Sequence, residues 1–300
     1  MKKNILVTGG AGFIGSNLVF ALQNQGYEVV VIDNLLSGSI ENLTGFNNEF
    51  IKDDISTMDL FSKFKNKKFD IIFHQASITD TTFSNQEEMI RANVEGFKNI
   101  LNLAKSKKAK LIYASSAGVY GRGKIPFNEN QELLPLNSYA ISKKMIDDIA
   151  KEEMEKNSIV IIGLRYFNVY GPKEKYKKKA ASMIYQLYLQ MKSGKRPRIF
   201  KYGEQKRDFI YVKDVITANL KAIESEKSCI VNVGTGVPTS FNKIVELLNQ
   251  ILKTNYKPDY FDNPYGFYQN ETQADTNLAF KLLGFKAKFS VEEGIKDYLL

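Results

Sequence analysis

The stretch Thr8-Gly9-Gly10-Ala11-Gly12-Phe13-Ile14-Gly15 decides how this chain of 300 residues folds. It follows a short apolar run that is typical of a strand, and it opens a helical pattern over 14–25. Glycines at this spacing let the backbone turn tightly and approach a pyrophosphate, whose charge then faces the N-terminus of a helix. The context therefore predicts a dinucleotide-binding loop, with an ordinary tight turn as the alternative.

Short apolar runs alternate with longer helical patterns through the first 170 residues. Runs such as 3–7 and 159–162 are nearly continuous, which is typical of parallel strands that are covered on both faces. We therefore predict an α/β protein with a Rossmann-type doubly wound parallel sheet. The expected strands span 4–8, 28–33, 49–52, 71–76, 110–116 and 160–167, and the main expected helices span 14–25, 85–105 and 138–155.

The pattern changes after Tyr170-Gly171-Pro172. We predict a nucleotide-binding domain over 1–170, with a return segment near 209–235, and a smaller C-terminal substrate-binding region over 171–300. Within that region a basic run leads into a helix, further helices are expected over 212–225 and 242–252, a short strand over 231–233, and a loop over 256–273.

Asp33 ends the second expected strand, about 20 residues beyond the glycine loop. A carboxylate at this place accepts hydrogen bonds from the adenosine ribose hydroxyls and disfavours a 2′-phosphate. The loop over 34–40 supplies no cation that would offset this charge, so NAD is predicted over NADP. Asp54 is expected to reach the adenine amino group, with a helix N-cap as the alternative.

Tyr139 and Lys143 are four residues apart in an expected helix and therefore share one of its faces. A free tyrosine is a poor base near neutral pH, but a nearby lysine, joined by an oxidised nicotinamide, favours the phenolate. Ser116 ends the fifth expected strand, at the carboxyl edge where open α/β sheets bind ligands. It is expected to bond both the reacting hydroxyl and Tyr139.

Composition narrows the chemistry. Cys229 is the single cysteine and His74 the single histidine, which exclude an internal disulfide and a multi-histidine metal centre. The expected site therefore holds no metal, and His74 is expected to pack near the cofactor. A net charge of +9 is typical of a lysine-rich solvated surface, with nucleic acid, an anionic membrane or a polyanionic small substrate as alternatives. No uncharged apolar stretch reaches 18 residues, so a cytoplasmic protein without membrane contact is expected.

These motifs, together with Ser115-Ser116-Ala117-Gly118-Val119-Tyr120-Gly121 and Arg165-Tyr166-Phe167-Asn168-Val169-Tyr170, occur in order along the chain. The sequence thereby resembles the extended short-chain dehydrogenase/reductase family, and within it the nucleotide-sugar epimerases and dehydratases. The resemblance implies catalytic roles for Ser116, Tyr139 and Lys143, and a substrate contact for Asn168. The residues expected to bind the cofactor are Gly9, Gly12, Phe13, Ile14, Gly15, Asp33, Asn34, Asp54, Ile55, Ala76, Asn93, Tyr139, Lys143 and Val169.

The C-terminal half is similar to the ADP-glycero-manno-heptose 6-epimerase group of that family. The similarity rests on Gly171-Pro172-Lys173-Glu174, on 205–215 and on Tyr268-Gln269. It implies that Lys177 is a second catalytic base, that Arg207 meets the diphosphate, that Phe200 and Tyr268 contact the substrate, and that the protein forms a homo-oligomer. Three features depart from the group. The group uses NADP and often carries a lysine about where Ile40 stands, and it usually has Lys-Gly-Ser at 177–179 and a histidine at Gln186. Cofactor and sugar therefore stay open here.

The resemblance implies an isomerase of carbohydrate metabolism, on the way to a lipopolysaccharide precursor. Its substrate would be a nucleotide-diphosphate sugar, which is oxidised transiently to a ketone and reduced again. A UDP-glucose 4-epimerase is the alternative enzyme; a dehydratase is less favoured because Ser116-Ala117-Gly118 lacks an acidic pair. A dinucleotide-sensing protein is the non-enzyme alternative. A nucleic-acid binder would use 173–179 and 195–198 as its basic patch. The alternative to a catalytic role for Lys177 is that it is an ordinary solvated lysine within the basic run over 173–179.

Overall fold

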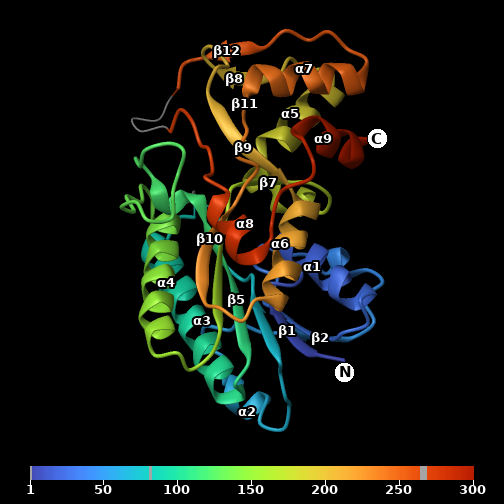
Figure 1. Cartoon of the computed structure of the whole chain (residues 1–300). Helices are drawn as coiled ribbons and strands as arrows, with labels where there is room; N and C mark the ends of the chain where they lie inside the picture. Colours follow the sequence, from blue (N-terminus) through green and yellow to red (C-terminus); the bar gives the residue numbers. More distant parts are fainter. Residues whose placement is uncertain (1, 81–82, 264–268) are drawn as a thin grey trace.

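The computed structural model describes residues 2–80, 83–263 and 269–300 (Figure 1). Its largest element is a sheet of seven strands in the order β10-β6-β5-β4-β1-β2-β3, and every pairing within it is parallel. The order reverses between β1 and β4, which is where open α/β sheets bind ligands. The strands are β1 (Asn4–Thr8), β2 (Glu28–Asp33), β3 (Glu49–Lys52), β4 (Ile71–His74), β5 (Lys110–Ser116), β6 (Ile161–Tyr166) and β10 (Cys229–Val233).

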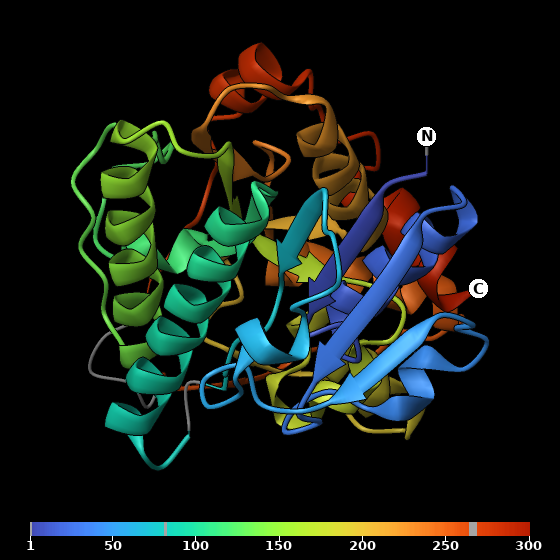
Figure 2. The same cartoon turned by 90° about the horizontal axis from the view of Figure 1, so that it is seen from below.

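Helices cover both faces of this sheet, because successive strand residues point to opposite sides and both sides are apolar. In β1, Ile5 and Val7 belong to one buried cluster, whereas Leu6 belongs to the other. Helices α1 (Phe13–Asn24) and α6 (Val212–Glu224) pack together over the first cluster. Figure 2 shows the long helices of the opposite face side by side. These are α3 (Gln86–Lys107) and α4 (Ser138–Glu155), with the short α2 (Leu60–Lys63) beside α3.

The remaining elements form two small sheets, which lie above the large sheet in Figure 1, and further short helices. The first small sheet has the order β11-β9-β7, and the second pairs β12 with β8. The strands are β7 (Asn168–Tyr170), β8 (Arg198–Phe200), β9 (Lys206–Tyr211), β11 (Pro238–Ser240) and β12 (Asp259–Phe261). The helices are η2 (Ala117–Tyr120), η3 (Glu174–Ala180), α5 (Met183–Lys192), α7 (Phe241–Leu252), α8 (Asn277–Leu283) and α9 (Val291–Leu299), while η1 (Ile40–Leu43) follows β2.

The predicted α/β class and parallel sheet are confirmed. From the expected return segment, β10 pairs with β6 in the large sheet, whereas 209–211 lies in β9 of a small sheet. The loop expected over 256–273 is wrong in part, since β12 lies within it. A strand of three residues has too short a pattern to be recognised, and its partner β8 lies some 60 residues earlier. Within the described ranges, no helix is both long and apolar enough to cross a membrane.

Candidate active site

A cavity of about 1100 Å³ lies where the carboxyl ends of the large sheet meet the small sheets. Every predicted site residue that the structure describes lines this cavity, although the chain supplies them from distant places. They are Gly9, Gly12, Phe13, Ile14, Gly15, Asp33, Asn34, Asp54, Ile55, Ala76, Asn93, Ser116, Tyr139, Lys143, Asn168, Val169, Lys177, Phe200 and Arg207. Tyr268 lies outside the described residues. The structure thus brings the candidates together, and their individual roles stay predictions.

The glycine loop presents bare backbone to the cavity. Gly9 has φ +68°, and a Cβ on this residue would lie 2.5 Å from the backbone nitrogen of Ala76. A Cβ on Gly15 would collide with the carbonyl oxygen of Gly9, so a side chain is excluded at both places. Gly12 is the N-cap of α1, whose first backbone N–H groups have no partner within the helix. This geometry suits a pyrophosphate at the helix N-terminus.

Asp33 stands at the end of β2 with only 8% of its surface exposed. Its carboxylate accepts hydrogen bonds from the backbone of Ala11 at 2.9 Å and of Leu35 at 2.8 Å. Burial raises the pKa of Asp33, although these backbone hydrogen bonds act in the opposite direction. The carboxylate is therefore held rigidly at the wall of the cavity, where a ribose would be recognised.

Asp54 lies beside Asn34, whose side chain donates a hydrogen bond of 2.9 Å to it. Asp54 also accepts bonds from the backbone and hydroxyl of Ser56, at 2.8 and 2.7 Å. Burial alone would raise the pKa of Asp54, but the bonds from Ser56 and Asn34 outweigh it and lower the pKa. The N-cap interpretation is wrong, because the residue that caps α2 is Asp59.

Tyr139 and Lys143 project from the first turns of α4, which Asn137 caps by accepting a 2.8 Å bond from the backbone of Ala140. Ser116 accepts a hydrogen bond of 3.1 Å from the backbone of Gly118 and lies near enough to Tyr139 to lower the pKa of its phenol. The Nζ atom of Lys143 donates to the carbonyl of Ala114 at 2.8 Å and lies 5.8 Å from the centre of the Tyr139 ring.

Burial controls the protonation of this pair. It raises the pKa of Tyr139, an effect that Ser116 opposes only in part, and it lowers the pKa of Lys143 to about 8. The lysine therefore does not by itself make Tyr139 a phenolate. An oxidised nicotinamide, when bound in this cavity, would add a second positive charge that favours the phenolate.

Lys177 differs from its neighbours in the basic run. It lies in η3 and lines the cavity, with its Nζ atom 5.9 Å from the centre of the Phe13 ring, whereas Lys178 and Lys179 are exposed. Burial lowers the pKa of Lys177, and Glu174 acts in the opposite direction. The solvated interpretation therefore fits Lys178 and Lys179 but not Lys177.

The far end of the cavity is lined by β7, β8 and β9. Arg207 donates to the backbone carbonyls of Lys206 at 2.7 Å and Asn270 at 3.3 Å. Asn168 accepts a bond of 3.3 Å from the hydroxyl of Thr272. Phe200 packs edge-on against Phe261 with ring centres 5.0 Å apart. This end therefore combines a cation, an amide and aromatic rings, which suits a polar ligand carrying a flat group.

Sequence reasoning missed several residues of this wall. They come from α5, β8, β12 and the residue before β9, and include Gln186, Gln190, Arg198, Gln205 and Phe261. Gln186 carried a signal as a departure from the resembled group, and Gln205 carried one as the first residue of the 205–215 motif. His74 fits its expected packing role, since it is buried, its Nδ1 atom lies 2.9 Å from the Thr8 hydroxyl, and burial lowers its pKa to about 3. No cluster of metal-ligating side chains occurs among the described residues.

Residues 5–234 match the model of the NAD dependent epimerase/dehydratase family. The chain belongs to this family. The ADP-L-glycero-D-manno-heptose-6-epimerase of Brachyspira hyodysenteriae is 40% identical over 307 residues, covering 98% of this chain and 96% of the relative. The predicted enzyme class, an NAD(P)-dependent nucleotide-sugar epimerase, and the resemblance to extended short-chain dehydrogenase/reductases are confirmed.

Solved structures of this epimerase/dehydratase family superpose over nearly the whole chain. The ADP-L-glycero-D-manno-heptose-6-epimerase of Helicobacter pylori has a TM-score of 0.94 and 43% identity, and covers 99% of this chain and 95% of its own. The UDP-glucose 4-epimerase of Thermotoga maritima, solved with UDP-glucose, has a TM-score of 0.92 and 33% identity, with 98% and 96% covered. The UDP-glucuronic acid 4-epimerase of Bacillus cereus, solved with UDP-glucuronic acid and NAD, has a TM-score of 0.87 and 29% identity, with 98% and 96% covered.

Proposed function

We propose that this protein is an ADP-glycero-manno-heptose 6-epimerase, acting on a nucleotide-diphosphate sugar. The observation that carries the proposal is that Tyr139 on α4 and Lys177 on η3 line one cavity from different elements. An epimerase that returns a hydride to the other face of a ketone benefits from two acid/base groups. The full-length relatives with this activity at 40% and 43% identity support the assignment.

The proposal gives each of these side chains a defined role in the reaction. The nicotinamide, when bound, supplies the chemistry of accepting a hydride from the carbinol carbon and giving it back. Tyr139 removes the proton of the reacting hydroxyl, and Ser116 bonds that hydroxyl and the phenol. Lys143 holds the nicotinamide ribose and keeps positive charge near Tyr139. Lys177 exchanges the proton of the hydroxyl that forms on the return step, and Arg207 meets the diphosphate.

The substrate is tested by incubating the purified protein with ADP-glycero-manno-heptose and, separately, with UDP-glucose. We expect epimerisation of the heptose, with a kcat/KM roughly 100-fold or more above that for UDP-glucose, because a polar site rejects a ligand that leaves its buried groups unpaired. Mass spectrometry of ligands released from the denatured protein gives an independent answer. Turnover of UDP-glucose alone would make the protein a UDP-glucose 4-epimerase, and retention of cofactor with neither turnover would favour a dinucleotide sensor.

NAD is expected to bind at least severalfold more tightly than NADP. The buried carboxylate of Asp33 repels a 2′-phosphate, and the segment over 34–40 carries no cation to offset it. Competitive titration of the cofactor-free protein measures the preference, and Asp33→Asn should narrow it because the charge is removed at nearly constant shape. Equal or tighter binding of NADP would mean that a lysine or arginine from elsewhere reaches the 2′-phosphate.

The assembly and compartment are part of the same proposal. The resemblance favours a homo-oligomer that acts in the cytoplasm, with no nucleic-acid partner. Light scattering behind a size-exclusion column measures the oligomeric state. Salt-dependent binding of an oligonucleotide would contradict the last part of the proposal.

A further inference from the structure

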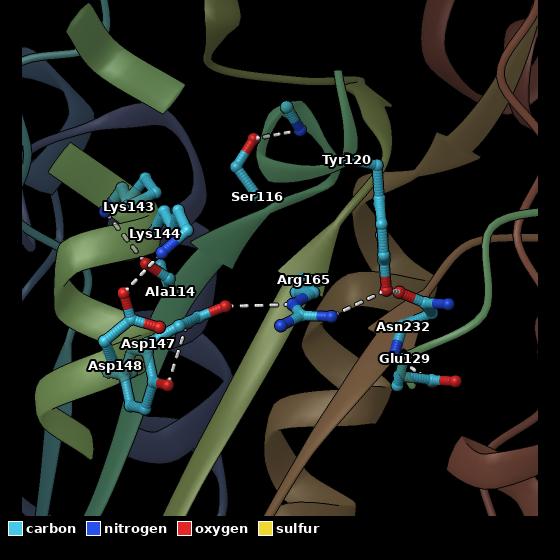
Figure 3. A network of polar contacts seen from close by, with 12 residues as sticks. Ala114, Ser116, Tyr120, Glu129, Lys143, Lys144, Asp147, Asp148, Arg165 and Asn232 are labelled. Carbon is cyan, nitrogen blue, oxygen red and sulfur yellow. Dashed lines mark hydrogen bonds and ion pairs between the residues drawn. The ribbon is translucent and has the colours of Figure 1, made fainter. Parts of the chain in front are cut away.

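A buried carboxylate lies directly beneath the catalytic pair. Asp147 follows Lys143 by four residues on α4, and Figure 3 shows it facing the sheet. Its carboxylate accepts a hydrogen bond of 2.9 Å from Nε of Arg165 and another of 2.9 Å from the hydroxyl of Tyr113. The side chains of Asp147 and Arg165 are 0% and 1% exposed. This ion pair is therefore closed off from solvent.

The pair is part of a longer network that ties α4 to the sheet (Figure 3). Arg165 donates to the hydroxyl of Tyr120 at 2.8 Å, and Tyr120 donates to the side chain of Asn232 at 2.6 Å. Helix α4 is thereby linked to β5, β6 and β10 through polar contacts that are directional as well as buried. Such contacts fix the rotation of the helix more strictly than apolar packing does.

Asp147 also stands between two buried cations. Burial alone would lower the pKa of Arg165, but Asp147 and Tyr120 outweigh it and raise the pKa, so Arg165 stays charged. Burial lowers the pKa of Lys143 to about 8, and Asp147 opposes that fall.

The other groups around Lys143 are uncharged near neutral pH. They are Tyr139 on α4, His74 at the end of β4, Tyr113 and the Ala114 carbonyl on β5, and, from α3, the amide of Asn93 that contacts Ser142. Asp147, which is ion-paired with Arg165, therefore supplies the negative charge in these surroundings of Lys143.

We propose that Asp147 is a positioning residue for the reaction, whose carboxylate serves as counter-ion to Lys143 and, through Arg165 and Tyr113, anchors the helix face that presents Tyr139 and Lys143 to the cavity. The proposal rests on the roles given to Tyr139 and Lys143 in the proposed function. It goes beyond them because Asp147 touches neither substrate nor cofactor. Its effect reaches the reaction through the charge and position of Lys143.

The test compares Asp147→Asn with Asp148→Asn. Asp148 is the matched control, since it is 44% exposed and paired with Lys144 at 2.7 Å on the same helix. The pKa of the Lys143 ammonium is measured by NMR titration of the cofactor-free protein. The signal of Lys143 is assigned as the one that is missing from the spectrum of Lys143→Met. We expect Asp147→Asn to lower the pKa of Lys143 by roughly one unit, since the field of a close opposite charge is lost, and Asp148→Asn to leave it unchanged.

The pH profile gives a second readout. Below both lysine pKa values Lys143 is charged in either protein, so the kcat/KM ratio of variant to wild type should be at its highest, and any loss there reflects the anchoring role alone. Above both values the ratio should have fallen by roughly tenfold, as a shift of one unit requires. A loss of the same size at every pH, together with an unchanged pKa of Lys143, would show that Asp147 is merely structural and would overturn the proposal.

A double variant keeps the test valid in case Asp147→Asn fails to fold. Asp147→Asn leaves Arg165 as an uncompensated buried charge, which is strongly destabilising. Asp147→Asn combined with Arg165→Gln removes both charges, and the pKa of Lys143 should still fall, by less than in the single variant. An unchanged pKa in the double variant as well would overturn the proposal. Because the NMR titration needs no substrate, a wrong assignment of the sugar would leave its result intact.

Discussion

Replacing Tyr139 by phenylalanine is expected to lower turnover by ~10²–10⁴-fold, while cofactor binding stays nearly unchanged. The substitution removes one hydroxyl, whose pKa Ser116 lowers, and keeps the ring beside Lys143. No other group in the proposed mechanism can take the proton of the reacting hydroxyl at that position. Steady-state turnover and a titration of NAD measure the two quantities.

Tyr27→Phe is the matched control, because Tyr27 precedes β2 at the end of the strand away from the cavity. It loses the same hydroxyl and should turn over at the wild-type rate. If Tyr139→Phe also turned over at nearly the wild-type rate, the proton would be taken by another group and the assignment of Tyr139 would be wrong.

Lys177→Met is expected to suppress epimerisation by ~10²-fold or more, while partial hydride transfer to the cofactor remains. Burial lowers the pKa of Lys177, which brings it closer to the working pH of an acid/base group. Methionine keeps an unbranched side chain of similar length and removes the amine. Single-turnover absorbance of the reduced nicotinamide follows the hydride, and chromatography of the sugar follows the epimer.

Lys178→Met is the control for this experiment, since the same residue type is replaced one position away at an exposed site. It should change neither readout by much. If both variants weakened substrate binding equally and left turnover alone, the run would act only as an electrostatic collar for the diphosphate. Tyr139 would then be the sole acid/base group, and the UDP-glucose 4-epimerase alternative would gain support.

Local signals were enough to predict the fold class and most of the residues that line the glycine-loop end of the cavity. The glycine loop, the apolar runs and the four-residue spacing of Tyr139 and Lys143 are patterns within one strand, loop or helix. The predicted helix over 14–25, for example, differs by one residue at each end from α1 (Phe13–Asn24). Such patterns depend only on residues that are close in the chain, so they can be recognised in the sequence without knowledge of the tertiary packing.

The far wall of the cavity depended on packing over long distances. Arg198 and Phe261 reach it because β8 pairs with β12, two strands of three residues separated by some 60 positions. The pKa of Tyr139 likewise rises because other elements bury it, an effect that the Tyr139–Lys143 spacing does not contain. Neither property has a local pattern from which it could have been predicted.

The basic run over 173–179 separates what the sequence determines from what the tertiary structure determines. The motif around Gly171-Pro172 marks where the run begins, yet Lys177, Lys178 and Lys179 are chemically identical side chains. In the folded chain Lys178 adopts φ 51°, which interrupts η3, and only Lys177 of the three lines the cavity beside Phe13. The sequence alone determines that a lysine-rich turn lies there, because the composition and spacing of the run are properties of the sequence. Burial selects which of the three amines faces the cavity, and a lysine is buried only once distant elements surround it.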